Sequence, residues 1–322
     1  MSKHVLFLLI LLFCVIAFVQ ASVGDERPLF NHCVDECVQV SCPAPLSFSL
    51  RLLQWSCPEN CRYVCMQAVT DKAIEEGLPV YQYYGKWPFY RCFGIQEPAS
   101  VLFSIGNGLV HAYYFRQIQK QVPSSYFFKG FMLLYTIIGM NAWLWSTIFH
   151  SRDTKFTELM DYFSAGLLVL YSLYYAILRV YRLTQGLIIQ ALGVLFICLF
   201  VAHVGYLIIV TFDYVYNMYA NVIVGGCQIA VWVGWFLVQT AQQTPAARSH
   251  YAHLAVISGI GVSLAMCLEL FDFPPLFRVF DAHSLWHLST IPLSIVWYKF
   301  LMQDTKHETN TKSYTAVKLL PA

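Results

Sequence analysis

Two histidines near the C-terminus have a spacing that suits metal binding. His283 and His287 are four residues apart, and in a helix this spacing places both imidazoles on one face. His150, far upstream, adds a third nitrogen ligand. Three protein ligands leave a fourth position open for water, as in catalytic zinc sites, and zinc lowers the pKa of that water toward neutrality. We therefore expect Zn²⁺ at His150, His283 and His287.

Two other polar residues suit the same chemistry. Ser146 precedes His150 by four residues and shares its helix face. Its hydroxyl can donate a hydrogen bond to the oxyanion that develops when an ester or amide is attacked. Asp161 can take a proton from water as a general base. The catalytic residues expected beside the metal are therefore Ser146 and Asp161.

Other interpretations of these residues stay open. A single histidine at a helix end is more often an interfacial or hydrogen-bonded residue than a ligand, and Asp161 can cap its own helix. Ser146, a histidine and Asp161 can also be arranged as a hydrolase triad. That triad is awkward when Ser146 and His150 share one rigid helix face, and it leaves the His283 and His287 pair unexplained. His203 is a reserve ligand.

The composition places these residues in a membrane protein. Hydrophobic residues make up 58% of the 322 residues and charged residues 12%, with a mean hydropathy of +0.55. A soluble domain carries about 25% charged residues. The formal net charge of +2 gives no reason to expect nucleic-acid binding. We expect an all-α membrane fold: a bundle of seven transmembrane helices with a small disulfide-rich luminal N-terminal region.

Seven apolar segments, each close to the length that a helix needs to cross a bilayer, supply the positions of these helices. They span residues 99–117, 127–149, 159–178, 186–210, 217–240, 251–270 and 282–301. We therefore expect a seven-transmembrane catalytic domain at 99–302. The polar residues 303–322 should form a disordered cytosolic tail.

The N-terminus has the pattern of a secretory signal peptide. Lys3 and His4 precede an apolar run that ends in small residues, so we expect cleavage after Ala21. An uncleaved signal anchor is the alternative. Residues 22–98 then enter the secretory lumen, and they hold seven of the 11 cysteines. Such a cluster predicts a disulfide framework that joins two short helices through their C-x3-C spacings, with one cysteine left over. A zinc site is the alternative for these cysteines.

The distribution of positive charge agrees with a luminal N-terminal region and a first span that runs from the lumen to the cytosol. If the head is luminal, the positive-inside rule predicts Lys and Arg in alternate loops and at the C-terminus. The segments predicted to be cytosolic contain Arg116, Lys120, Lys129, Arg179, Arg182, Arg248, Lys299, Lys306, Lys312 and Lys318. The segments predicted to be luminal beyond the head contain only Arg152, Lys155 and Arg278.

The direction of the spans also fixes the depth of the candidate residues. Ser146 and His150 end the second span, Asp161 begins the third, and the two C-terminal histidines begin the seventh. All five residues therefore lie at the luminal membrane surface. Polar groups in spans are costly and mark functional sites. Glu269 and Asp272 lie on the same side and can support a histidine from behind.

These motifs carry a resemblance to a known family. The chain resembles the family of post-GPI attachment to proteins factor 3, Per1-like proteins within the superfamily of alkaline ceramidases and adiponectin/progestin receptors. The resemblance covers nearly the whole mature chain. The segments that carry it are 141–153 (NAWLWSTIFHSRD), 158–163 (ELMDYF), 269–275 (ELFDFPP), 281–288 (DAHSLWHL), 57–61 (CPENC) and 84–89 (YGKWPF).

The resemblance implies an activity and a compartment. Members of that family remove the sn-2 unsaturated fatty acid from the glycosylphosphatidylinositol (GPI) lipid of anchored proteins, a phospholipase A2 reaction. His150, His283 and His287 would then bind zinc, with Ser146 and Asp161 beside it. The expected partners are GPI-anchored proteins and membrane lipids. The expected location is the Golgi membrane, with the endoplasmic reticulum (ER) membrane as the alternative.

Three rival functions remain. An alkaline ceramidase would cleave an amide with the same metal site, although the ceramidase branch lacks a large cysteine-rich head. A seven-span receptor fits the topology, and a non-catalytic chaperone for GPI-anchored proteins fits the head. A receptor or chaperone role should survive loss of the metal ligands, whereas a hydrolase should not.

Overall fold

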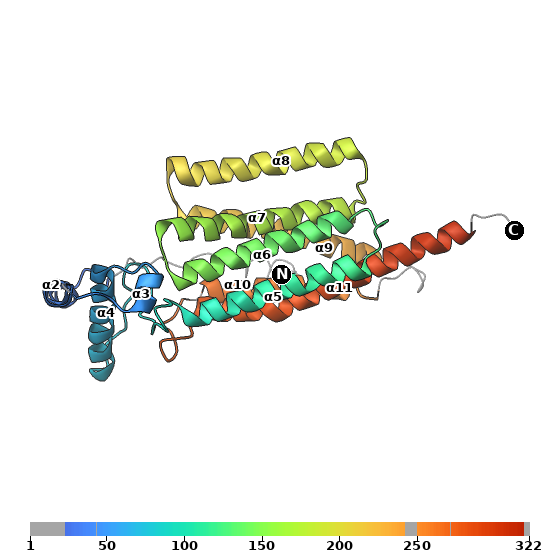
Figure 1. Cartoon of the computed structure of the whole chain (residues 1–322). Helices are drawn as coiled ribbons and strands as arrows, with labels where there is room; N and C mark the ends of the chain where they lie inside the picture. Colours follow the sequence, from blue (N-terminus) through green and yellow to red (C-terminus); the bar gives the residue numbers. More distant parts are fainter. Residues whose placement is uncertain (1–22, 43, 242–249, 271, 319–322) are drawn as a thin grey trace, which may run out of the picture. The chain divides into compact units, whose positions relative to one another are not determined.

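A computed structural model describes residues 23–42, 44–241, 250–270 and 272–318, with side chains except at residue 270 and at 311–318 (Figure 1). Within these residues the regular structure is helical, and β pairing is limited to isolated bridges. The all-α membrane fold expected from the sequence is confirmed. The predicted signal peptide at 1–21 lies outside the described residues.

The chain forms two compact units. The first, called the head unit, contains the described residues up to Phe103 together with His150–Asp153 and Ala265–Leu288. The second, called the bundle unit, contains Ser104–Phe149, Thr154–Leu264 and the described residues from Ser289 onward.

The head unit is built on two helices that disulfides join. These are α2 (Pro28–Ser41) and α4 (Cys57–Glu75), with the short α3 (Phe48–Leu52) between them in sequence. A reciprocal cap between Ser56 and Glu59 starts α4, because each side chain bonds the other's backbone N–H. Phe30 and Tyr83 pack around the disulfide-bonded Cys65 in a small core.

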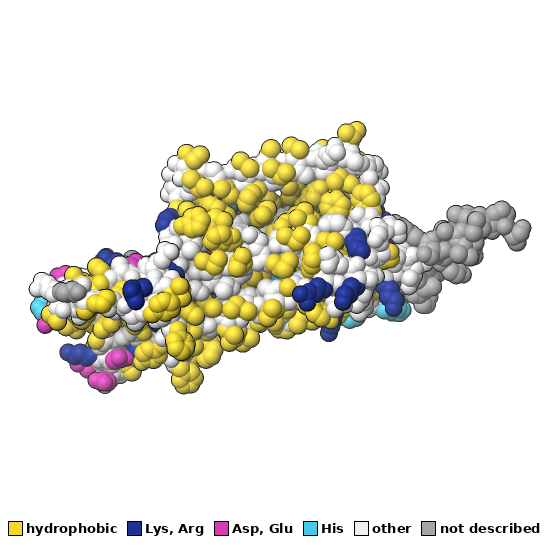
Figure 2. Space-filling view, in the orientation of Figure 1, with side chains coloured by type: hydrophobic (Ala, Val, Ile, Leu, Met, Phe, Trp, Pro, Cys, Tyr) yellow, Lys and Arg dark blue, Asp and Glu magenta, His cyan; other side chains and the backbone are white. Residues whose placement is uncertain are grey.

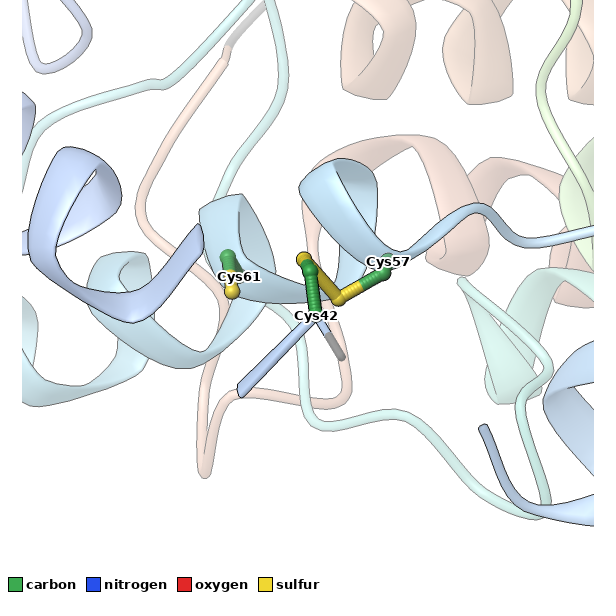
Figure 3. A group of neighbouring side chains, drawn as sticks. All are labelled: Cys42, Cys57 and Cys61. Carbon is green, nitrogen blue, oxygen red and sulfur yellow. A yellow bond between two sulfur atoms is a disulfide. The ribbon is translucent and has the colours of Figure 1, made fainter. Parts of the chain in front are cut away.

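Three nested disulfides supply most of the covalent order of this small unit. Cys33 bonds Cys65, Cys37 bonds Cys61, and Cys42 bonds Cys57. Figure 3 shows the Cys42–Cys57 bond with Cys61 close by. All three sulfurs of this group belong to disulfides, so the disulfide framework is confirmed over the alternative zinc site. Cys92 is the cysteine of this region that stays unpaired.

Two tight turns follow α4 and shape the remainder of the head. In each, a glycine with positive φ follows another residue with positive φ: Tyr84 with Gly85, and Phe93 with Gly94. A positive φ at both central residues favours glycine at the second. The second turn is fixed from outside, because the indole N–H of Trp55 donates to the carbonyl of Gly94 at 2.9 Å.

Seven helices follow one another from Pro98 onward in the described residues, and each predicted span coincides with one of them. They are α5 (Pro98–Gln121), α6 (Lys129–Ser151), α7 (Lys155–Val180), α8 (Gly186–Gly205, continued by the π-helical turn η1, Tyr206–Val210), α9 (Tyr214–Thr240), α10 (His253–Leu270) and α11 (Ala282–Lys318).

Four of these segments are both long and apolar enough to cross a membrane: α6, α7, α8 with η1, and α9. Seven spans therefore stay a prediction, while these four helices support a membrane protein by their length and composition. The disordered tail expected from Gln303 differs from the structure, because α11 continues to Lys318. Residues 303–318 contain neither proline nor glycine to stop a helix.

The bundle unit buries many aromatic rings in its core and exposes many aliphatic side chains on its surface. Its core includes Tyr298 stacked on Tyr114 with ring centroids 4.5 Å apart, and Trp232 against Phe300 at 5.0 Å. Figure 1 shows α8 alongside α7, and α8 has no buried residue along its described length. Figure 2 shows hydrophobic side chains over the face formed by α6, α7 and α8. An outward aliphatic surface of this kind suits contact with lipid.

One buried ion pair ties α7 to α11 within the bundle unit. The Arg179 guanidinium donates from Nε and Nη2 to the two carboxylate oxygens of Asp304, both at 2.7 Å. Arg179 and Asp304 are each 1% exposed. Glu308 lies 3.2 Å from Arg179 and 2.7 Å from Arg182. This network gives the first turns of the predicted tail a reason to stay helical.

Replacing Arg179 with alanine should lower the stability of the bundle unit by about 3–5 kcal/mol, because Asp304 would remain buried without its partner. The expected result is a clear fall in the thermal unfolding midpoint of the protein in detergent. The matched control is Arg179→Met combined with Asp304→Leu, which removes both charges and should recover most of the loss. A wild-type midpoint for the single variant would contradict this account.

Candidate metal centre

The three predicted histidines converge in the head unit. His150 Nε2 lies 3.2 Å from His283 Nε2, which lies 2.9 Å from His287 Nε2. A ligand atom from each histidine falls within 4.8 Å of the other two. His150 and His287 are buried at 2% and 1% exposure, whereas His283 is partly exposed. The cluster therefore offers three imidazole nitrogens around one point.

Local capping sets the place where α11 begins and so where its two histidines stand. The backbone N–H of Ser284 donates to the Asp281 carboxylate at 2.8 Å, and the N–H of Asp281 donates to the Ser284 hydroxyl at 3.0 Å. This reciprocal cap starts the helix at Ala282. His283 and His287 consequently lie in its first two turns, four residues apart on one face.

Two carboxylates support the histidines from behind. Glu97 Oε2 lies 2.7 Å from His150 Nδ1, and Glu269 Oε2 lies 2.5 Å from His283 Nδ1. Support from Glu269 was expected from the sequence, whereas Asp272 instead accepts from Gln82 and Trp87. Glu97 was missed. Its signal was an acidic residue two positions before the first predicted span, which begins at residue 99.

The donor set fits a zinc ion. An ionised carboxylate can only accept a hydrogen bond, so His150 and His283 each carry a proton on Nδ1, and the Nε2 of each ring is the atom that can bind a metal. Two such nitrogens 3.2 Å apart can share either a proton or a metal ion, and when both rings are neutral their lone pairs repel each other. A Zn–N bond of about 2.0–2.1 Å and tetrahedral angles place ligand nitrogens about 3.3 Å apart. A carboxylate behind a metal-binding histidine is the usual arrangement.

Glu97 is itself held in place as an anion. Burial alone would raise its pKa, but the charge of Lys86 and the hydrogen bonds from Lys86 and His150 hold the pKa of Glu97 well below its usual range. Lys86 Nζ lies 2.5 Å from Glu97 Oε1 and 3.1 Å from the Asp153 carboxylate. The backbone N–H of Glu97 also donates to the His150 carbonyl at 3.0 Å. Glu97 therefore stays charged at every pH of the secretory pathway.

The two predicted catalytic residues belong to the bundle unit. Ser146 lies one turn before His150 in α6, is 5% exposed, and its hydroxyl is 2.9 Å from that of Ser104. Asp161 lies near the start of α7 and is partly exposed. Their roles beside the metal stay a prediction.

The alternative hydrolase triad loses support from the contacts of His150. A triad histidine must accept from serine with one ring nitrogen and donate to aspartate with the other. Here Nδ1 faces Glu97 and Nε2 faces His283. The reserve ligand His203 is engaged elsewhere, because its Nε2 lies 3.2 Å from the side-chain oxygen of Asn217 in the bundle unit.

Replacing Glu97 with glutamine should weaken zinc binding about 10–100-fold, the range for a residue that supports a metal ligand. The amide keeps the size of the side chain but loses the charge that orients His150. Zinc affinity can be measured by competition with a chelator of known affinity. Asp71→Asn is the matched control, since Asp71 pairs with Arg278 in the same unit. Wild-type affinity for Glu97→Gln would contradict a supporting role.

Comparison with known proteins places this centre in a family. The sequence profile of the Per1-like family matches residues 47–305, which include all three histidines. The chain belongs to the Per1-like family. The resemblance noted from the sequence motifs is thereby confirmed.

The Per1-like relatives match over most of both chains. A GPI-specific phospholipase A2-like protein, PGAP3, of Cricetulus griseus is 37% identical over 92% of this chain and 93% of its own. The PER1 homolog of Schizosaccharomyces pombe is 38% identical over 90% and 89%. PGAP3 of Homo sapiens is 35% identical over 92% and 93%. No solved structure matches the chain.

Proposed function

We propose that this Per1-like protein is a zinc-dependent hydrolase that removes the sn-2 fatty acid from the GPI lipid of anchored proteins. The observation that carries the proposal is the group of three histidines, two of them backed by carboxylates. Relatives named GPI-specific phospholipase A2-like supply the substrate class. Buried polar groups of this kind in a membrane protein mark a functional site.

His150, His283 and His287 would hold the metal through their Nε2 atoms, while Glu97 and Glu269 keep two of the rings in the required tautomer. A zinc ion at this place supplies a Lewis acid and lowers the pKa of water so that hydroxide is available at neutral pH. Asp161 would take the proton of the attacking water as general base. The Ser146 hydroxyl would donate to the oxyanion that develops on the ester carbonyl.

The overall reaction balances with water as the only co-substrate. Water oxygen forms a bond to the acyl carbon, and the bond between that carbon and the glycerol sn-2 oxygen breaks. The proton taken by Asp161 returns to the departing glycerol oxygen. The products are a free fatty acid and a GPI lipid with one chain fewer. Asp161 is again an ionised carboxylate at the end of the reaction.

We propose that the head unit faces the lumen and that the C-terminal helix ends in the cytosol. The positive-inside distribution supports this orientation, and Figure 2 shows Lys and Arg side chains gathered where α5 ends and α6 begins. Three disulfides in the head also require an oxidising compartment. The compartment that we propose is the Golgi membrane, with the ER membrane as the alternative.

The test in cells is the sn-2 chain composition of GPI anchors after deletion of this protein. Unsaturated sn-2 chains should accumulate, and the wild-type chain should correct them while His283→Ala/His287→Ala should not. Equal rescue by the double variant would overturn metal-dependent hydrolysis in favour of a chaperone or receptor. Ceramide levels measured in the same cells serve as the control, because a ceramidase would change them and leave the anchors intact.

A further inference from the structure

We propose that the head unit contains a pocket for the phosphate-bearing sugar headgroup of the lipid substrate. The inference rests on the proposed function, since it assigns a subsite for that same substrate. A cavity of about 190 Å³ lies in the head unit between α4, the turn residues after it and Arg152. Water occupies about 30 Å³ per molecule in the liquid, so the cavity has room for a group of several heavy atoms such as a phosphate.

One wall of this cavity is a stack of alternating guanidinium groups and aromatic rings. The Arg91 guanidinium carbon lies 3.5 Å from the ring centre of Trp55 and 4.1 Å from that of Tyr63. The Arg152 guanidinium carbon lies 3.7 Å from the centre of Trp55. Both cations can approach so closely only from opposite faces of the indole. The order is therefore Arg152, Trp55, Arg91, Tyr63, and it fixes the Arg91 plane without using its N–H groups.

The arginine at the centre of this stack keeps unused hydrogen-bond donors. Arg91 Nε and Nη1 are buried and have no hydrogen-bond partner among the described residues. Burial lowers the pKa of Arg91 to about 10, so it stays charged at neutral pH. A buried charged donor without an acceptor is costly. Arginine donors in this fork geometry match the oxygens of a phosphate.

A second arginine on the cavity supplies another free cation. Arg62 is exposed and lies over the Tyr84 ring at 5.3 Å, and it forms no ion pair with a carboxylate in the described part of the chain. By contrast, Lys86 and Arg152 are neutralised, by Glu97 and Glu59 respectively. Four cations on the lining (Arg62, Lys86, Arg91 and Arg152) stand against three carboxylates (Glu59, Asp153 and, through its pair with Lys86, Glu97). The cavity therefore has a surplus of one positive charge, which favours an anionic ligand.

The other lining groups suit a sugar or an inositol ring better than a bare ion. Tyr84 and Trp87 line the cavity, and an aromatic ring can pack against the C–H face of a sugar ring. Glu59 and Asp153 add carboxylate oxygens that can accept hydrogen bonds from hydroxyls. Aromatic faces, carboxylates and free arginines together match a phosphate ester carried on a polyhydroxyl ring. A glycosylphosphatidylinositol, as its name states, carries a glycan, a phosphate and an inositol ring.

A short chain of contacts connects this pocket to the histidines. Lys86 lines the cavity, its Nζ lies 2.5 Å from Glu97 Oε1, and Glu97 Oε2 lies 2.7 Å from His150 Nδ1. In a glycerophospholipid, the phosphate and the sn-2 ester are attached to neighbouring glycerol carbons. A pocket that binds the phosphate would therefore present the sn-2 ester, rather than a more distant bond, to the metal centre.

The test measures binding of a water-soluble headgroup to the full-length protein in detergent by calorimetry. The probes are myo-inositol 1-phosphate, the delipidated GPI glycan with its inositol phosphate, and inorganic phosphate. Arg91→Gln and Arg62→Gln should each weaken binding of the first two probes about tenfold or more, as loss of a charge-assisted hydrogen bond implies. Arg27→Gln is the matched control, because Arg27 also lies over a ring, that of Tyr81 at 4.7 Å, outside the cavity.

The design separates this pocket from catalysis. The His283→Ala/His287→Ala protein should bind both headgroup probes as tightly as wild type does. Wild-type affinity in Arg62→Gln and Arg91→Gln would overturn the pocket, even with sn-2 hydrolysis intact. Equal affinity for inorganic phosphate would reduce it to a general anion site and also overturn the proposal. Headgroup binding that depends on both arginines, in a protein that cleaves no sn-2 ester, would support the pocket and contradict the proposed function. Arg62 is exposed, so its variant keeps the test valid if Arg91→Gln fails to fold.

Discussion

Replacing His287 with alanine should remove bound zinc and lower sn-2 deacylation by more than about 100-fold, beyond the range for a residue that only supports a ligand. His287 is almost fully buried, and its Nε2 lies 2.9 Å from His283 Nε2. Its loss leaves two nitrogens where the catalytic arrangement needs three. Zinc content by mass spectrometry and fatty acid release from GPI lipid are the two measurements.

The control for this variant is His203→Ala. His203 is also a helix histidine, but its contacts are with Asn217 and Tyr216 in the bundle unit. This variant should keep both zinc and activity. A His287→Ala protein that still deacylates GPI lipid at the wild-type rate would remove the histidine cluster from the mechanism.

Replacing Asp161 with asparagine should lower kcat about 10²–10⁴-fold, the range for a general base, and leave the zinc content unchanged. Ser146→Ala should lower kcat about 10²–10³-fold, which is the range for the loss of one oxyanion donor. The pattern of bound metal with lost turnover separates these residues from the ligands. Steady-state kinetics together with metal analysis of each purified variant provide the measurement.

Glu158→Gln is the matched control for Asp161→Asn. Glu158 lies one turn earlier in α7 and pairs with Lys155 at 3.0 Å near the surface. The Glu158→Gln variant should have the wild-type kcat, because an ion pair near the surface contributes little to stability. If Asp161→Asn also retains wild-type kcat, another group must take the proton of the water.

Sequence periodicity was sufficient to predict the helices and the pairing of His283 with His287 on one helix face. Long apolar runs have few structural solutions in a membrane, so the predicted spans coincide with α5 to α11. His283 and His287 follow from helical spacing alone. His150 was added because it was predicted to lie at the same depth in the membrane as the other two histidines. The structure agrees, since the three rings converge in the head unit. The disulfide partners could not be predicted, since spacing is compatible with several pairings.

The supporting residues were harder to predict because they come from irregular segments. Glu97 lies just before α5, and Lys86 lies in the first tight turn, where no periodicity marks a functional position. Arg91 and Trp55 are far apart in sequence and meet only through the fold of the head. The pair between Arg179 and Asp304 supports the helical continuation of α11, and these two residues are 125 positions apart in sequence.

The most direct test of the account is hydrolysis of a GPI lipid labelled in its sn-2 chain by the purified full-length protein. The protein is stripped of metal with a chelator, assayed, reloaded with zinc and assayed again, alongside His287→Ala. The account predicts that labelled free fatty acid forms only with the zinc-loaded wild-type chain and that the sn-1 chain stays in place. Undiminished release by the metal-free protein, or no release by the zinc-loaded one, would contradict it.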